Sequence, residues 1–178
     1  MALTLKQFFA EMDRSRTNPT LQALIRTMEQ LDVEFEDIET FAKFSPHSYQ
    51  RNLIHQGPHY QALILCWKNG QRSPIHDHRG SACGVRIIKG VATETLFEKG
   101  PNGHIRATFS RDLHAGQVCG SYDDDIHQVS NLQAQDADLI TLHVYSPPLL
   151  KMGTYSLTDT RVGEFVDPIF EFAHGAGI

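Results

Sequence analysis

Apolar residues recur every three or four positions along the first part of the chain, over residues 3–12 and again over 21–31. Such spacing places apolar side chains on one face of a helix. Residues 3–45 are therefore predicted to be helical, with a break at Pro19 and a third short helix over 34–42.

From about residue 49 the pattern changes to short β-branched and apolar runs separated by Gly, Pro, Asn and Asp. Runs of this length and composition are typical of strands. Asn102-Gly103 favours a hairpin between two of them, because Asn-Gly accepts positive φ angles. Six or more closely spaced strands predict a mainly β fold, a sandwich or a small barrel. The predicted strands cover residues 61–67, 82–89, 91–98, 104–110, 126–130 and 138–146.

Composition and charge fit one globular domain of 178 residues, with 40% hydrophobic and 21% charged residues. We expect a helical part (1–45), a β core (49–148) and a C-terminal extension (149–178) that packs on the core. The net charge of -5, without a Lys/Arg block, disfavours nucleic-acid and acidic-membrane partners. No apolar run approaches the ~20 residues of a membrane span.

The cysteine count bears on the compartment. Cys66, Cys83 and Cys119 are an odd number without C-x-x-C spacing, which argues against a secreted disulfide framework. The N-terminal residues mix acids with apolar residues and do not match a secretory signal. The predicted location is a reducing cytoplasm, with Cys66 and Cys119 in strand cores.

The ten histidines are the first feature of the sequence that indicates a chemical function. If residues 75–78 are extended, His76 and His78 project from one face and Asp77 from the other, because alternate side chains share a side. Two histidines so placed are more often structural than metal-binding, so a third ligand is needed. His127, on a separate predicted strand, is the candidate.

The spacing around His76 and His78 reproduces the first cupin motif, with Cys83 where most cupins have glutamate. The flanking glycines of that motif are Gly70 and Gly90. Residues 116–131 resemble the second cupin motif through Gly116, His127 and Asn131. Tyr122 and Asp124 stand where proline and glycine are usual, a departure that concerns the loop and leaves the ligand in place.

Over residues 49–148 the chain resembles the cysteine dioxygenases, thiol dioxygenases of the cupin superfamily. Several motifs in the right order are more specific than any single one. The matching segments are Tyr49-Gln50-Arg51-Asn52-Leu53, Leu65-Cys66-Trp67, Ser73-Pro74-Ile75-His76-Asp77-His78, Glu94-Thr95-Leu96-Phe97, His127 to Asn131, and Leu142-His143-Val144-Tyr145-Ser146-Pro147-Pro148.

The resemblance implies a cupin-type jelly-roll β-barrel preceded by N-terminal helices, and one non-haem Fe(II) held by His76, His78 and His127. Three neutral imidazoles leave the iron its full charge, whereas the common triad of two histidines and a carboxylate neutralises part of it. A cation beside a thiol favours the thiolate, the form that binds metal. The family reaction adds both atoms of O2 to the sulfur of L-cysteine and gives the sulfinic acid without a nicotinamide or flavin.

The resemblance also assigns the substrate clamp to Arg51, with Tyr49 beside it. A planar, permanently charged guanidinium suits a carboxylate. The related mercaptopropionate dioxygenases carry glutamine at this position, so Arg51 favours cysteine as the substrate.

Cys83 and Tyr145 match the residues that a thioether joins beside the iron in animal-type members of the family. Thr141, His143 and Tyr145 share one face of a predicted strand and resemble the family's relay of hydroxyl, imidazole and phenol. The Tyr145 hydroxyl is expected to hydrogen-bond O2 or the substrate. The resemblance also implies a cis Ser146-Pro147 bond.

Alternatives stay open at the level of the sequence. The same chemistry could act on 3-mercaptopropionate or another small thiol, the fold could bind metal without turnover, or the site could hold zinc in a hydrolase. Arg79 could approach the substrate carboxylate or face solvent. The expected partners are a small thiol and O2, in a monomer or weak homo-oligomer.

Overall fold

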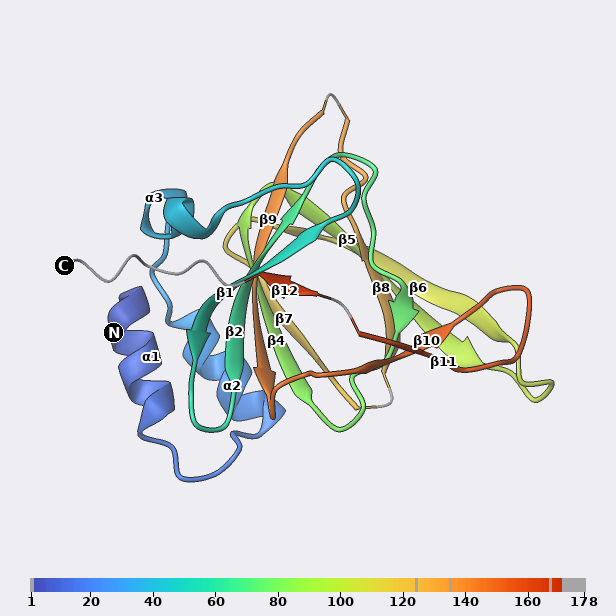
Figure 1. Ribbon diagram of the computed structural model, residues 1–178, viewed down its shortest axis with the longest axis horizontal. Helices are drawn as coiled ribbons and strands as arrows, with labels where there is room; N and C mark the ends of the chain where they lie inside the picture. Colours follow the sequence, from blue (N-terminus) through green and yellow to red (C-terminus); the bar gives the residue numbers. More distant parts are fainter. Residues whose placement is uncertain (1, 124, 135, 167, 171–178) are drawn as a thin grey trace.

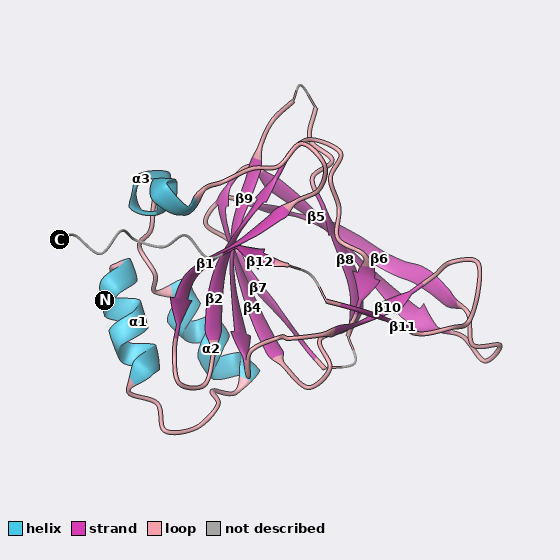
Figure 2. Ribbon diagram, viewed as in Figure 1, coloured by secondary structure: helices cyan, strands magenta, loops and turns pink. Residues whose placement is uncertain are grey.

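The computed structural model describes residues 2–123, 125–134, 136–166 and 168–170. Within these residues two six-stranded sheets face each other, and helices cover the outer face of one of them (Figures 1 and 2). The helical elements are α1 (Leu5–Asp13), α2 (Leu21–Glu29), α3 (Phe35–Ile38) and the 3-10 turn η1 (Glu39–Phe41). The strands are β1 (Gln50–Gln56), β2 (Gln61–Trp67), β3 (Ile75–His76), β4 (Ala82–Lys89), β5 (Val91–Lys99), β6 (Ile105–His114), β7 (Val118–Tyr122), β8 (Ile126–Ser130), β9 (Leu139–Ser146), β10 (Met152–Tyr155), β11 (Gly163–Phe165) and β12 (Ile169–Phe170).

The first sheet has the order β12-β1-β2-β9-β4-β7, and the second has the order β11-β10-β3-β8-β5-β6. Neighbouring strands run antiparallel, except that β12 pairs with β1 in parallel. The chain crosses repeatedly between the sheets, so residues far apart in sequence meet on the inner surfaces that enclose the core.

The N-terminal helices begin where the sequence supplies a cap. Thr4 and Gln7 form a capping box at α1, and the Thr20 side chain accepts a hydrogen bond from Ala23 N at α2. Both helices bury one apolar face against the first sheet, in a cluster that includes Leu24 and Met28. A Cβ at Gly84 would collide with the Met28 sulfur, so this glycine lets α2 lie close to β4.

Strands β2 and β9 are buried along their whole length, because helices cover one face and the second sheet covers the other. This double cover explains their continuous apolar sequences. Their inner face carries Leu63, Leu65 and Trp67 together with the polar residues of the site.

The six predicted strands are present, with β6 extending four residues beyond its predicted end. The sequence analysis missed β1, β3, β7 and the three strands after residue 150. The C-terminal extension packs on the core through part of its apolar side chains: Leu149 and Met152 are buried in the core cluster and Ile169 packs against it, whereas Phe165 and Val166 are exposed. Backbone pairing of β10 with β3 and of β12 with β1 also attaches the extension. Residues 171–178, also part of that prediction, lie outside the described residues.

Among the described residues, no helix has the length and apolar character that a membrane crossing requires. The Ser146-Pro147 peptide bond is cis, as expected.

Candidate metal centre

Three histidines from two neighbouring strands converge inside the barrel. His76 ends β3 and lies opposite His127 of β8 in the strand register, while His78 follows two residues later. Their candidate ligand nitrogens all lie within 4.8 Å of one another, and all three side chains are buried. The predicted meeting of these residues is confirmed.

Each imidazole is oriented by a partner at its Nδ1 atom. His76 Nδ1 lies 3.0 Å from the carbonyl oxygen of Pro74, and His127 Nδ1 lies 3.1 Å from a carboxylate oxygen of Glu94. A carbonyl and a carboxylate only accept, so both Nδ1 atoms carry the proton and both Nε2 atoms offer a lone pair. His78 Nδ1 lies 3.1 Å from the hydroxyl of Ser121, which can accept or donate.

The protonation states of His76 and His78 favour the binding of a cation. Burial, followed by the repulsion of neighbouring histidines, lowers the pKa of His76 to about 3 and that of His78 well below its usual value. Both rings are therefore neutral near pH 7. The Nε2 atoms of His78 and His127 lie 3.3 Å apart, and a cation bound between them satisfies both lone pairs. Imidazole donors suit Fe, Zn, Cu and Ni.

Cys83 occupies the position where the cupin motif usually places glutamate. It lies directly opposite Tyr145 in the pairing of β4 with β9, and its thiol forms a side-chain hydrogen bond with that residue. Burial raises the pKa of the Cys83 thiol well above its usual value. Cys66 and Cys119 are also buried, as predicted, and burial raises the pKa of each to about 12.

A directed chain of hydrogen bonds leads to Tyr145 from the opposite side. The Trp67 indole Nε1, which can only donate, lies 3.1 Å from the Thr141 hydroxyl, and that hydroxyl lies 3.0 Å from His143 Nε2. With its oxygen accepting from Trp67, the Thr141 hydroxyl can donate to His143 Nε2. His143 then donates from Nδ1 to the Tyr145 hydroxyl oxygen, 3.1 Å away.

Arg51 and Tyr49 border the same enclosed space as the three histidines. The Arg51 guanidinium is buried 5.5 Å from the centre of the Tyr145 ring, and Tyr49 stacks on Trp67 with ring centres 4.3 Å apart. Met152 of β10 completes the wall. The cavity measures about 10 Å³, the room of one ion or water molecule.

Asp77 and Arg79, beside the ligands, turn away from the centre. Asp77 accepts hydrogen bonds from Gly153 N and the Tyr155 hydroxyl, which agrees with its predicted direction. Arg79, which the sequence left undecided, is partly exposed and pairs with Glu164 of β11 at 3.0 Å. It therefore attaches the loop after His78 to the C-terminal hairpin.

The acidic run after β7 makes hydrogen bonds to the loop after His78 and within its own loop. Asp123 accepts a hydrogen bond from Gly80 N at 2.6 Å, and Asp125 accepts one from Tyr122 N at 2.9 Å. Asp124, the site of the departure from the second cupin motif, lies outside the described residues.

Glu94, Ser121 and Met152 were not singled out by the sequence analysis. Glu94 appeared there only inside a matching segment, although it stands two residues from Ala92 and Leu96 on a strand with an inward apolar face. A charged residue in such a pattern is a signal that could have drawn attention to it. Ser121 and Met152 carry no comparable signal.

A two-sheet β-barrel with three inward imidazoles defines the class: a metal-binding protein of the cupin fold. Two solved structures share the fold, the protein TT1209 from Thermus thermophilus and a conserved protein with a double-stranded β-helix domain from Klebsiella pneumoniae. Their TM-scores are 0.53 and 0.52 at 19% and 15% identity; they cover 65% and 67% of this chain and 99% and 94% of their own.

The sequence matches the family model for cysteine dioxygenase type I over residues 3–158, and the chain belongs to this family of oxygenating enzymes. Cysteine dioxygenase type 1 of Bos taurus is 33% identical over 89% of this chain and 88% of its own length. The Homo sapiens protein of that name is 34% identical, with 81% of each chain covered.

The neutral buried histidines make stability depend on pH. Burial also lowers the pKa of His143 well below its usual value. As the pH falls below about 6.5, the unfolded chain binds protons at these positions while the folded protein does not, down to about pH 3 for His76. The free energy of unfolding of the metal-free protein should therefore decrease over that window, by up to ~1.4 kcal/mol per pH unit for each histidine.

Urea unfolding at several pH values measures this slope. His143→Gln should reduce this slope by the contribution of one bound proton, whereas His114→Gln, at an exposed position, should leave the slope unchanged. Equal slopes in all three proteins would contradict the assignment.

Proposed function

We propose that the protein is a non-haem Fe(II) dioxygenase that adds both atoms of O2 to the sulfur of L-cysteine and releases cysteine sulfinic acid. The observation that carries the proposal is the buried Arg51 guanidinium on the wall of the cavity where three buried imidazoles converge. A metal-binding triad and a fixed cation together suit a small molecule with a thiolate and a carboxylate. The names of the relatives support the same substrate.

His76, His78 and His127 would hold the iron through their Nε2 atoms. Fe(II) bound there would supply the positive charge that favours a substrate thiolate and the redox centre at which O2 is activated. The neutral state of the rings preserves that charge. Arg51 would bind the substrate carboxylate through paired charge-assisted hydrogen bonds, which fixes the position of the sulfur.

Tyr145 would act on the reacting groups through its hydroxyl. In the tautomer with the proton on Nδ1, His143 would donate to the phenol oxygen, and the phenol hydrogen would be directed elsewhere, towards the substrate or oxygen. His143 stays neutral because burial and the Arg51 charge lower its pKa. Thr141 and Trp67 hold the imidazole in the required tautomer.

The enclosed cavity would exclude water from the reaction. Its volume of about 10 Å³ is the room of one ion or water molecule.

Cys83 and Tyr145 would form the thioether of animal-type family members, since they lie opposite each other in the strand register. The thiol hydrogen and one hydrogen of the tyrosine ring would be lost, and O2 would take up the two electrons. Cys83→Ala should lower the rate of O2 uptake without abolishing it. It should also convert any double band on a denaturing gel into a single band. Cys119→Ala, at another buried thiol, is the matched control and should leave the gel pattern unchanged. A double band that persists in Cys83→Ala would contradict the crosslink.

A cytoplasmic location completes the proposal and is supported by three buried free cysteines, which are typical of a reducing compartment. The test of function is O2 uptake by anaerobically iron-loaded protein with L-cysteine and, separately, 3-mercaptopropionate. Mass spectrometry of the products should identify cysteine sulfinate as the preferred product. Preference for mercaptopropionate would overturn the substrate, and the absence of uptake with either thiol would favour a non-catalytic metal-binding protein.

A further inference from the structure

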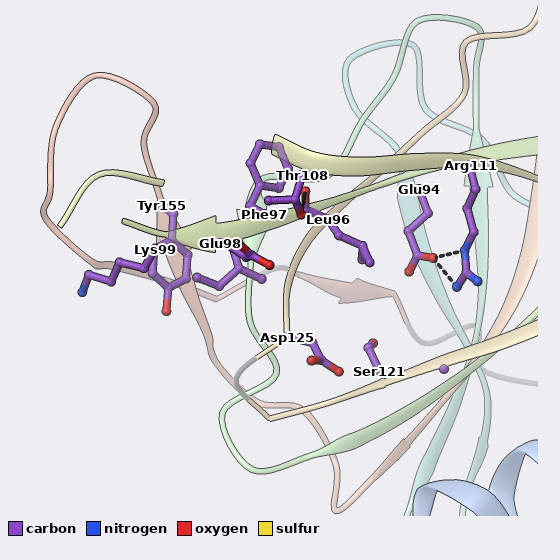
Figure 3. Close-up of a pocket in the computed structure, with 12 residues that line it drawn as sticks. Glu94, Leu96, Phe97, Glu98, Lys99, Thr108, Arg111, Ser121, Asp125 and Tyr155 are labelled. Atoms are coloured by element: carbon purple, nitrogen blue, oxygen red, sulfur yellow. Dashed lines mark hydrogen bonds and ion pairs between the residues drawn. The ribbon is translucent and has the colours of Figure 1, made fainter. Parts of the chain in front are cut away.

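A buried carboxylate stands directly behind one of the three candidate ligands. Glu94 lies on β5 with 3% of its surface exposed, and its Oε1 atom is 3.1 Å from Nδ1 of His127. Its Oε2 atom accepts two hydrogen bonds from Arg111, from Nε at 2.8 Å and from Nη2 at 2.6 Å (Figure 3). Glu94 and Arg111 are direct partners in the pairing of β5 with β6, so the sheet register fixes the arrangement.

The three imidazoles have chemically different partners. A neutral carbonyl supports His76, a neutral hydroxyl supports His78, and an ionised carboxylate supports His127. Two hydrogen bonds from the Arg111 guanidinium to Oε2 stabilise the ionised form of Glu94. A carboxylate acceptor fixes the tautomer of a ligating histidine and makes it a stronger donor.

From this geometry we propose that Glu94, anchored by Arg111, is a positioning residue that raises the metal affinity of the centre through His127. The proposal rests on the proposed metal centre. The chain has Cys83 at the position where most cupins supply a carboxylate ligand, and Glu94 supplies a negative charge one imidazole away from the metal. The metal thus keeps three neutral ligands and gains electrostatic stabilisation from the protein around it.

The outer side of this ion pair can be reached from solvent. Glu94, Arg111 and Ser121 border a cavity of about 590 Å³ that also contains Glu98 and Lys99 (Figure 3). This cavity is distinct from the small one bordered by Arg51. A small carboxylate in solution can therefore enter the space that a truncated Glu94 side chain would leave.

The test measures metal affinity directly, by competition of the full-length protein with a chromophoric chelator for Zn(II) and Co(II). Glu94→Gln keeps the size of the side chain and removes its charge, and the dissociation constant should rise ~10–100-fold. The Co(II) absorption bands should shift as well, because His127 becomes a weaker donor. Glu98→Gln, which removes an exposed charge from the same cavity, should change neither quantity.

Two further variants separate a positioning role from a structural one. Glu94→Asp should bind metal more tightly than Glu94→Gln, and Glu94→Ala should regain affinity when formate is added. Affinities of Glu94→Gln and Glu94→Ala equal to that of the unaltered protein would overturn the proposal, as would a loss in Glu94→Ala that formate does not reduce. An unaltered protein that binds no metal would instead refute the proposed function.

Discussion

Replacement of His76, His78 or His127 by alanine should leave a protein without stoichiometric iron and with O2 uptake at background level. The three candidate ligand atoms share one small volume, and the described residues around it contribute no carboxylate to the group. If each of the three ligands carries about a third of the ~10 kcal/mol of a tight protein metal site, the loss of one costs ~3 kcal/mol. The dissociation constant should then rise at least ~100-fold.

Metal analysis of the purified variants, together with O2 uptake, checks this result. His114→Ala is the matched control, because His114 is exposed at the end of β6. Thermal unfolding of the metal-free proteins separates loss of the ligand from loss of the fold. A variant that retains one iron per chain and full turnover would show that the ligand set is wrong.

Replacement of Arg51 by glutamine should reduce kcat/KM for L-cysteine by ~10²-fold or more. The substitution replaces the buried guanidinium by a neutral amide. Removal of one partner of a buried, hydrogen-bonded charge pair costs ~2–5 kcal/mol of binding free energy. Cysteamine has the thiol and the amine of cysteine but no carboxylate, so the same variant should oxidise it at nearly the unaltered rate.

Steady-state kinetics with both thiols measures the difference. Arg79→Gln is the control, since Arg79 pairs with Glu164 away from the cavity and should affect neither substrate strongly. An equal loss with cysteine and cysteamine would count against a carboxylate clamp. Such a result would make Arg51 a structural residue of the barrel wall.

The sequence predicted those helices and strands whose apolar pattern lies within the element itself. The helices at residues 5–13 and 21–29 follow from apolar spacing and caps, and β2 and β9 follow from long apolar runs. Strand β1 was missed because it is rich in polar residues, and its burial depends on pairing with β2. Strands as short as β3 and β12 carry no periodic signal. That residues 1–178 form one domain stays a prediction.

The candidate site, too, could be predicted from the sequence only in part. His76, His78 and His127 were chosen from motif spacing and Tyr145 from the family resemblance, and the four side chains lie together in the structure. The contact of Glu94 with His127 could not be predicted, because it depends on the registers that join β5 to both β6 and β8. The direction of the Arg79 side chain could not be predicted either, because its partners lie on β11, 84 or more residues further along the chain.

The buried state of the protein's own thiols has a consequence for its durability as a catalyst. A thiol must lose its proton to bind a metal or to be oxidised readily, and burial raises the pKa of Cys83, Cys66 and Cys119 far above neutrality. In the proposed enzyme, Fe(II) would acidify an incoming substrate thiol, whereas Cys66 and Cys119 would stay protonated and compete poorly with it for the metal. The difference in acidity between these two internal thiols and the substrate thiol would thus direct oxygen to the substrate and away from them.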